Sequence, residues 1–278
     1  MGVPFEYKLT PNRILRGTVY PSRRETKGIL VVCHGYKGFK DWGFFPYIGQ
    51  KLSERYHVIT FNFTHNGIGE DLLEFTELEK FAGNTYSREQ EDLSVLIGAI
   101  RRGETPLGDT GGLSVYLLGH SRGAGDCLIY ALDHPDEIAG VVSWNGVTNV
   151  DLFSDKEKAE MKERGRTYIL NGRTKQQMPL NREILDDLEA NAERFNILGR
   201  ISELQPPAVL IQGKDDGERL RKGSAALTQL RPDIPWLQVP GGNHTFGAVH
   251  PFQGTTAALE EAIRLTLGWL KEQEERNE

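Results

Sequence analysis

Cysteine is scarce in this sequence, where only Cys33 and Cys127 occur among 278 residues. Two thiols cannot build a disulfide framework or a multi-cysteine metal site. Both stand in apolar contexts, and we predict that they are buried thiols. Hydrophobic residues make up 38% of the chain, which is sufficient for a core that needs neither disulfides nor metal.

Long apolar runs are also missing. No stretch approaches the roughly 18 apolar residues of a membrane-spanning helix. The N-terminal stretch MGVPFEYKLTPNRIL lacks the basic, apolar and small-residue segments of a secretory signal. We therefore expect a cytoplasmic protein with no membrane partner.

Clusters of basic residues are absent as well. Lys and Arg number 33 against 39 Asp and Glu, which gives a formal net charge of −6 at pH 7. A nucleic-acid-binding surface needs a basic footprint along the phosphate backbone, so this balance argues against nucleic acid as a partner. A small-molecule substrate fits better, and a homodimer is compatible with the sequence.

What the sequence does contain is an alternation of strand-like and helix-like segments. Apolar runs such as ILVV and VYLL lack polar alternation, which indicates strands covered by helices on both faces. This predicts an α/β fold with a mostly parallel, doubly wound, eight-stranded sheet in a single domain, residues 1–278. The predicted strands are 5–9, 13–20, 28–33, 56–63, 113–118, 138–144, 207–212 and 234–239, and the predicted helices are 45–54, 88–102, 122–133, 217–230 and 255–273.

Residues 147–205 interrupt this alternation. They separate two predicted strands by far more than the few residues usual in such connections. They carry the charged stretches DKEKAEMKERGRTY and LNREILDDLEANAERF, which are typical of amphipathic helices. Because open α/β sheets bind ligands at the carboxyl ends of their strands, we predict that 147–205 is a helical cap or lid there. The alternative is a solvated helical insertion without substrate contact.

The central motif is Gly119-His120-Ser121-Arg122-Gly123, which lies directly between the predicted strand LSVYLL and a predicted helix. A serine in a tight strand-to-helix turn has a strained backbone, and the flanking glycines avoid clashes between strand and helix. Its hydroxyl is exposed at the edge of the sheet, beside a helix N-terminus that favours negative charge. Ser121 is therefore the candidate nucleophile.

A serine nucleophile needs a base to remove its proton and an acid to orient that base. The order expected along the chain is serine, acid, histidine. Beyond the segment PAVLIQGKDDG, His244 follows the predicted strand IPWLQV by a short loop and is the candidate base. His250 precedes Pro251 and fits a packing or capping role. Asp215 and Asp216 both remain candidates for the acid.

Attack on a carbonyl also requires hydrogen-bond donors for the oxyanion that forms. The backbone N–H of Arg122, directly after the nucleophile, is the first candidate. The second is the N–H of Tyr36 in HGYKG, the segment after the predicted strand GILVVC. Glycines in this segment allow the backbone to approach a ligand closely.

Four segments together resemble the α/β-hydrolase superfamily, in particular its dienelactone-hydrolase-like and cinnamoyl-esterase-like serine hydrolases. They are HGYKG, GHSRGA, IQGKDDG and GGNHTFG, which follow successive predicted strands within residues 28–247. The resemblance implies hydrolysis of a carboxylic ester, or a related acyl bond, of a small molecule through an acyl-enzyme. It implies no metal or organic cofactor.

The resemblance also selects the acid. In such relatives the acid lies three residues beyond the glycine that closes the strand, and three residues beyond Gly213 is Asp216. Dienelactone hydrolases proper use cysteine where this chain has Ser121, so their activity is not implied.

Two other interpretations stay open. Peptidases of the prolyl-oligopeptidase type share the strand-to-helix turn that carries the serine, called the nucleophile elbow. They also share the order serine, acid, histidine of the catalytic triad, so an aminopeptidase or acyl-peptidase is the nearest enzymatic alternative. Such enzymes usually add a propeller domain, for which 278 residues leave no room. The second is a non-catalytic binding protein on a hydrolase scaffold. Because each triad role has a candidate, a serine carboxylesterase is favoured.

Overall fold

The structure is a computed structural model that describes residues 2–26 and 28–276. Within these ranges the chain forms an eight-stranded sheet of order β1-β2-β4-β3-β5-β6-β9-β10 and a two-stranded sheet, β7-β8. β2 pairs antiparallel with both β1 and β4, and the other neighbours in the large sheet run parallel. The strands are β1 (Val3–Thr10), β2 (Arg13–Tyr20), β3 (Gly28–Cys33), β4 (His57–Asn62), β5 (Ser114–His120), β6 (Gly140–Trp144), β7 (Arg166–Leu170), β8 (Gln177–Asn181), β9 (Ala208–Gly213) and β10 (Trp236–Val239).

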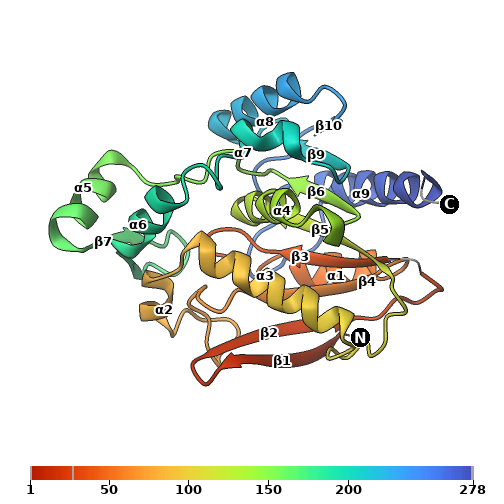
Figure 1. The fold of residues 1–278 in the computed structure, drawn as a ribbon, viewed down its shortest axis with the longest axis horizontal. Coiled ribbons are helices and arrows are strands. Elements are labelled where there is room, and N and C mark those ends of the chain that lie inside the picture. Colours follow the sequence, from red (N-terminus) through yellow and green to blue (C-terminus); the bar gives the residue numbers. More distant parts are fainter. Residues whose placement is uncertain (1, 27, 277–278) are drawn as a thin grey trace.

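Helices cover both faces of the large sheet (Figure 1). Apolar residues of α3, α4 and α8 join the core on one face, and those of α1 and α9 join the core on the other. The helices are α1 (Phe45–Leu52), α2 (Leu78–Ala82), α3 (Tyr86–Arg101), α4 (Arg122–Asp133), α5 (Asp155–Arg164), α6 (Glu183–Ala190), α7 (Ile197–Arg200), α8 (Glu218–Leu230) and α9 (Ala257–Arg276), with short 3-10 turns at Pro135–Glu137 and Ile201–Glu203.

The central strands are buried along their whole length, as their apolar runs predict. Every residue of β3 and β9 is buried, because helices lie on both sides of a parallel sheet. The apolar stripe of α3, which includes Leu93 and Ile97, is buried against that sheet. The predicted fold class is confirmed, and each of the eight predicted strands lies within two residues of its observed bounds.

The insertion 147–205 contains helices, as predicted, and also a hairpin, whose two strands overlap the ends of the stretches predicted as helical. α5 ends at Gly165, whose left-handed φ of 76° turns the chain out of the helix. The next residues, RTYIL, include β-branched and aromatic side chains that favour a strand, and they pair antiparallel as β7 with β8. The insertion is therefore a mixed helix-and-hairpin unit.

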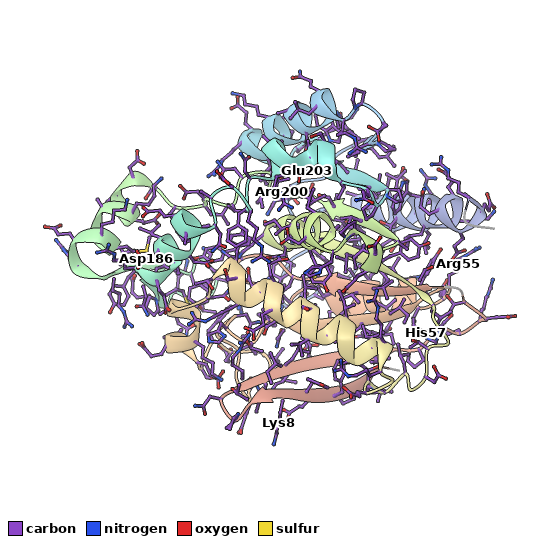
Figure 2. The ribbon with its side chains drawn as sticks, viewed as in Figure 1. Lys8, Arg55, His57, Asp186, Arg200 and Glu203 are labelled. Carbon is purple, nitrogen blue, oxygen red and sulfur yellow. The ribbon has the colours of Figure 1, made fainter. Side chains whose placement is uncertain are left out.

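The insertion lies at the carboxyl end of the parallel strands. Figure 2 labels Asp186 on α6 and, on the opposite side of the molecule, His57, the first residue of β4. Since His57 marks the amino end of its strand, α6 lies toward the carboxyl end. This is the edge at which open α/β sheets place their ligands.

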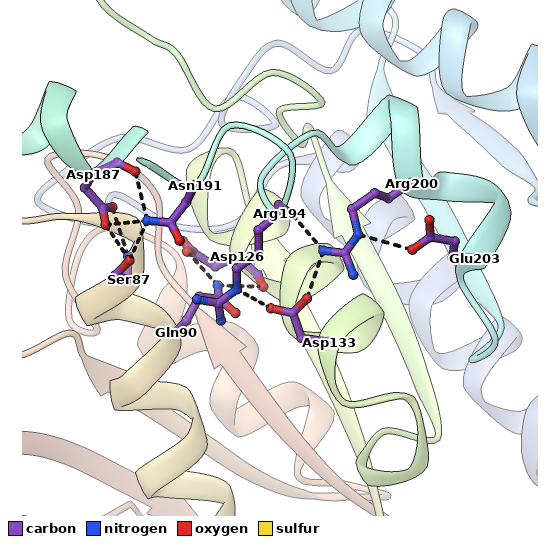
Figure 3. Close-up of polar contacts among 9 residues, drawn as sticks. All are labelled: Ser87, Gln90, Asp126, Asp133, Asp187, Asn191, Arg194, Arg200 and Glu203. Atoms are coloured by element: carbon purple, nitrogen blue, oxygen red, sulfur yellow. Dashed lines mark hydrogen bonds and ion pairs between the residues drawn. The ribbon is translucent and has the colours of Figure 1, made fainter. Parts of the chain in front are cut away.

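Polar contacts attach the insertion to α3 and α4 (Figure 3). Asp187 of α6 accepts hydrogen bonds from Ser87 at the start of α3. Arg194 and Arg200 both bind Asp133 at the end of α4, at 2.6 and 2.8 Å. Together with a separate apolar cluster under α5, α6 and the hairpin, these contacts fix the insertion on the main sheet. Among the described residues, no helix combines the length and hydropathy that a bilayer crossing requires.

Candidate active site

Ser121 occupies a tight turn between β5 and α4. Its backbone has φ 56° and ψ −118°, a strained conformation for a residue with a side chain. A Cβ on Gly119 would lie 2.3 Å from the carbonyl oxygen of Gly123, and a Cβ on Gly123 would lie 2.5 Å from the carbonyl oxygen of Cys33. Positions 119 and 123 must therefore both be glycine for the turn to form.

His244 and Asp216 meet Ser121 in a hydrogen-bonded chain. The Nε2 atom of His244 lies 3.0 Å from the Oγ of Ser121, and its Nδ1 lies 2.8 Å from an oxygen of Asp216. Asp216 also accepts hydrogen bonds from the side chain of Gln212 and the N–H of Gly217, each at 2.8 Å. Burial raises the pKa of Asp216, but the hydrogen bonds from His244 and Gln212 outweigh it and hold the pKa below its ordinary value.

The two alternatives considered from the sequence lie elsewhere. Asp215 is exposed and donates its backbone N–H to the carbonyl of Gly242. The Nδ1 of His250 accepts the backbone N–H of Gly43 at 2.9 Å, and its ring stacks on Trp42. Neither side chain takes part in the chain of hydrogen bonds at Ser121.

The loop after β3 places the N–H of Tyr36 beside the elbow. The carbonyl of Gly35 accepts hydrogen bonds from the Nδ1 of His34 at 2.9 Å and from the N–H of Gly38 at 3.0 Å. In a trans peptide the next N–H points the opposite way, so the N–H of Tyr36 faces away from both donors. It donates no hydrogen bond to any other described residue. A Cβ on Gly35 would lie 3.0 Å from the Cβ of Ser121, so this loop packs directly on the elbow.

His34 holds this loop as a neutral side chain. Burial lowers the pKa of His34 to about 4. With Nδ1 donating to the Gly35 carbonyl, Nε2 is free to accept the side-chain N–H of Asn66 at 3.2 Å. The neutral ring thus links the Tyr36 loop to the loop after β4.

The backbone N–H of Arg122 is the part of this residue that belongs to the candidate site, whereas its side chain is buried in the interior. As the first residue of α4, its N–H has no acceptor within the helix. The side chain is 2% exposed and binds Glu89 of α3 at 2.7 Å. Its guanidinium also lies 3.9 Å from the ring of Tyr86 and 5.5 Å from the ring of Tyr36. Arg122 therefore connects the elbow helix, α3 and the Tyr36 loop.

Two cavities open beside Ser121 and His244, and both also include Tyr36. The larger has a volume of about 290 Å³, and the smaller has a volume of about 170 Å³. The larger is also lined by Val147, Thr148, Asn149, Leu152, Arg219 and Leu220. The smaller is also lined by Gly35, Lys37, Gly38, Trp42, Phe45, His120 and Thr245.

A sequence model described as the alpha/beta hydrolase fold matches residues 28–175, more than half of the chain. The protein belongs to the α/β-hydrolase family. No curated protein sequence matches it.

Solved structures share the fold of this α/β hydrolase at low sequence identity. Est1E from Butyrivibrio proteoclasticus is 12% identical, with a TM-score of 0.69 over 97% of this chain and 98% of its own. The α/β hydrolase GrgF from Penicillium sp. sh18 is 15% identical, with a TM-score of 0.69 over 98% and 99%. A monoacylglycerol lipase from Paleococcus ferrophilus is 18% identical, with a TM-score of 0.67 over 93% and 99%.

Asn145, which lies in none of the sequence motifs, links the two loops of the hydrolase that carry Asp216 and His244. Its side chain is fully buried after β6, on a backbone with φ 46°. Its oxygen accepts the N–H of Gly213 at 2.8 Å, and its nitrogen donates to the carbonyl of His244 at 2.8 Å and of Asn243 at 3.3 Å. Asparagine tolerates positive φ better than most residues, so an asparagine directly after a buried strand was the available signal.

We expect Asn145→Ala to destabilise the hydrolase more than Asn145→Gly does. Both variants lose the cross-link and leave the buried N–H of Gly213 without its partner, at a cost of about 1–3 kcal/mol, whereas the carbonyls of His244 and Asn243 keep hydrogen bonds from His120 and Phe246. Alanine adds about 1–2 kcal/mol of strain at positive φ, which glycine avoids. Urea unfolding of the two variants measures the difference. Equal stability, or a more stable alanine variant, would show that the left-handed backbone at this position is not strained.

Proposed function

We propose that this hydrolase is a serine carboxylesterase that cleaves small-molecule esters through an acyl-enzyme. The observation that carries the proposal is the hydrogen-bonded chain from Ser121 through His244 to Asp216, at 3.0 and 2.8 Å, on a strained elbow beside two cavities. A serine hydroxyl becomes a nucleophile when an imidazole accepts its proton and a buried carboxylate orients that imidazole.

In the first half-reaction, the Oγ of Ser121 attacks the ester carbonyl while the Nε2 of His244 takes its proton. The oxyanion that forms accepts hydrogen bonds from the backbone N–H groups of Tyr36 and Arg122. When the tetrahedral intermediate collapses, the C–O bond to the alcohol breaks, and His244 gives its proton to the departing oxygen. The acyl group is then esterified to Ser121.

In the second half-reaction, water attacks the acyl-enzyme with His244 again as the base. The second tetrahedral intermediate releases the carboxylic acid and returns the proton to the Oγ of Ser121. Asp216 stays ionised throughout, because its lowered pKa favours the carboxylate. It holds the imidazole in the tautomer that accepts from serine and stabilises the imidazolium.

An ester panel tests this proposal and separates esterase from peptidase. p-Nitrophenyl esters from acetate to decanoate are assayed beside feruloyl esters and aminoacyl anilides. Feruloyl esters are included because one structural neighbour, Est1E, was solved with ferulic acid bound. Cleavage of esters alone supports the carboxylesterase. Preferential cleavage of the anilides supports the peptidase, and inertness toward every substrate and toward a fluorophosphonate supports a non-catalytic binding protein.

We further propose that the start of the insertion, residues 147–152, sets the acyl preference. Val147, Thr148, Asn149 and Leu152 line the larger cavity, whereas the hairpin and α6 pack on the separate apolar cluster. The part of 147–205 that contacts substrate is then its first six residues.

Leu152→Trp should shorten the accepted acyl chain. The larger side chain fills part of the 290 Å³ cavity, so kcat/KM for decanoate should fall about tenfold or more while that for acetate changes about twofold or less. Leu170→Trp is the matched control, since Leu170 is an exposed residue of the hairpin. An identical chain-length profile for Leu152→Trp and the parent would show that 147–152 does not contact the acyl group.

A further inference from the structure

Each cavity beside Ser121 is lined by one basic side chain and by no acidic one. Lys37 lines the smaller cavity, and Arg219 lines the larger. Within residues 2–26 and 28–276, neither side chain forms an ion pair. In a chain of net charge −6, this leaves a positive site around the candidate nucleophile.

Lys37 stands where the backbone disfavours a lysine. The N–H of Gly38 bonds to the carbonyl of Gly35, so Tyr36 and Lys37 are the central residues of a tight turn. Lys37 has φ 55°, and the corresponding position of a type II turn favours glycine or asparagine. A left-handed conformation costs a residue with a Cβ about 1–2 kcal/mol. Strain of this kind collects at functional sites, where the side chain is needed.

Arg219 also stands where local electrostatics disfavour it. It is the second residue of α8, and the positive end of the helix dipole destabilises a cation in the first turn. Its guanidinium donates a hydrogen bond to the backbone carbonyl of Asp151, which holds it beside the cavity. The carboxylate of Asp151 is paired with Lys158 at 2.8 Å. Arg219 is thus held in place without being neutralised.

We propose that the substrate of this hydrolase is an anionic ester, whose carboxylate or comparable anion binds Lys37 or Arg219 while its carbonyl lies at Ser121. The inference rests on the serine esterase function proposed above. Because each of the two cavities beside Ser121 has its own cation, the anion can be on the acyl part or on the alcohol part of the ester.

Two matched pairs of esters test the inference. In the first pair the acyl part differs: p-nitrophenyl hexanoate is neutral, and mono-p-nitrophenyl adipate carries a carboxylate. In the second pair the alcohol part differs: phenyl acetate is neutral, and 4-acetoxybenzoate carries a carboxylate. We expect kcat/KM for the anionic member of at least one pair to exceed that of its neutral partner about tenfold, mainly through a lower KM. The preference should decline with added salt, because screening weakens exposed charge pairs.

Three variants assign the preference to its residues. Lys37→Met and Arg219→Gln each remove one cation, and in the double variant the ratio of kcat/KM between the anionic ester and its neutral partner should fall to about twofold or less. Lys222→Met is the control, since Lys222 lies on α8 like Arg219, is exposed and lines neither cavity. It pairs with Glu218.

The outcomes separate the inference from the function on which it rests. Neutral esters cleaved as fast as both anionic ones, or a preference that survives in the double variant, would overturn the inference and leave the esterase intact. A preference equally reduced by Lys222→Met would also overturn it, because general charge would then be the cause. No cleavage of any of the four esters would overturn the inference, and it would overturn the esterase as well if the substrates of the ester panel and the fluorophosphonate also failed to react.

Discussion

Replacing Ser121 with alanine should lower kcat for ester hydrolysis about 10⁶-fold, since loss of a triad nucleophile removes the acyl-enzyme route. A residual rate of about 10³–10⁴ over water should remain from binding and the oxyanion donors. The fold should persist, because the Oγ hydrogen-bonds only to the part-exposed His244 among the described residues. Steady-state kinetics, with circular dichroism and urea unfolding to verify folding, measure both expectations.

The matched control for this variant is Ser94→Ala. Ser94 is an exposed serine of α3 and lines neither cavity, so its loss should leave kcat unchanged. A folded Ser121→Ala protein that hydrolyses the same ester at the parent rate would show that another group is the nucleophile.

The second large effect is expected at Asp216. Asparagine at this position would present an N–H or a neutral oxygen to the Nδ1 of His244 and favour the wrong tautomer, at a cost of about 10⁴ in kcat. Asp215→Asn changes an exposed side chain one residue away and should alter kcat about twofold or less. The measurement is kcat for the two variants under identical conditions.

The paired design makes the result decisive. A large loss of kcat confined to Asp215→Asn would identify Asp215, and not Asp216, as the acid that orients His244. Parent activity in both variants would mean that the carboxylate 2.8 Å from His244 does not assist the base.

The fold and most of the candidate site follow from local sequence signals. The run GILVVC predicts a buried strand because both of its faces are apolar, and Gly119 and Gly123 predict the elbow because no Cβ fits there. The choice of Asp216 over its neighbour depended on the resemblance to known hydrolases. The segment GKDDG contains two adjacent carboxylates, and only the three-dimensional turn directs one of them to His244.

Other features depend on contacts that no local pattern encodes. The strand-favouring residues RTYIL of the hairpin directly follow a charged helix, and only a left-handed glycine, Gly165, marks where the helix ends and the hairpin begins. The role of Asn145 depends on Gly213 and His244, which are 68 and 99 residues away in sequence. The pairing of Arg122 with Glu89 is likewise a contact between two helices, α4 and α3.

Active-site labelling with a fluorophosphonate, followed by peptide mass spectrometry, tests the central claim most directly. We predict one adduct per chain, on the peptide that contains Ser121, with esterase activity lost in proportion to labelling and no adduct in Ser121→Ala. An adduct on a different residue that abolishes activity, or full ester hydrolysis by protein whose Ser121 is completely labelled, would contradict Ser121 as the nucleophile.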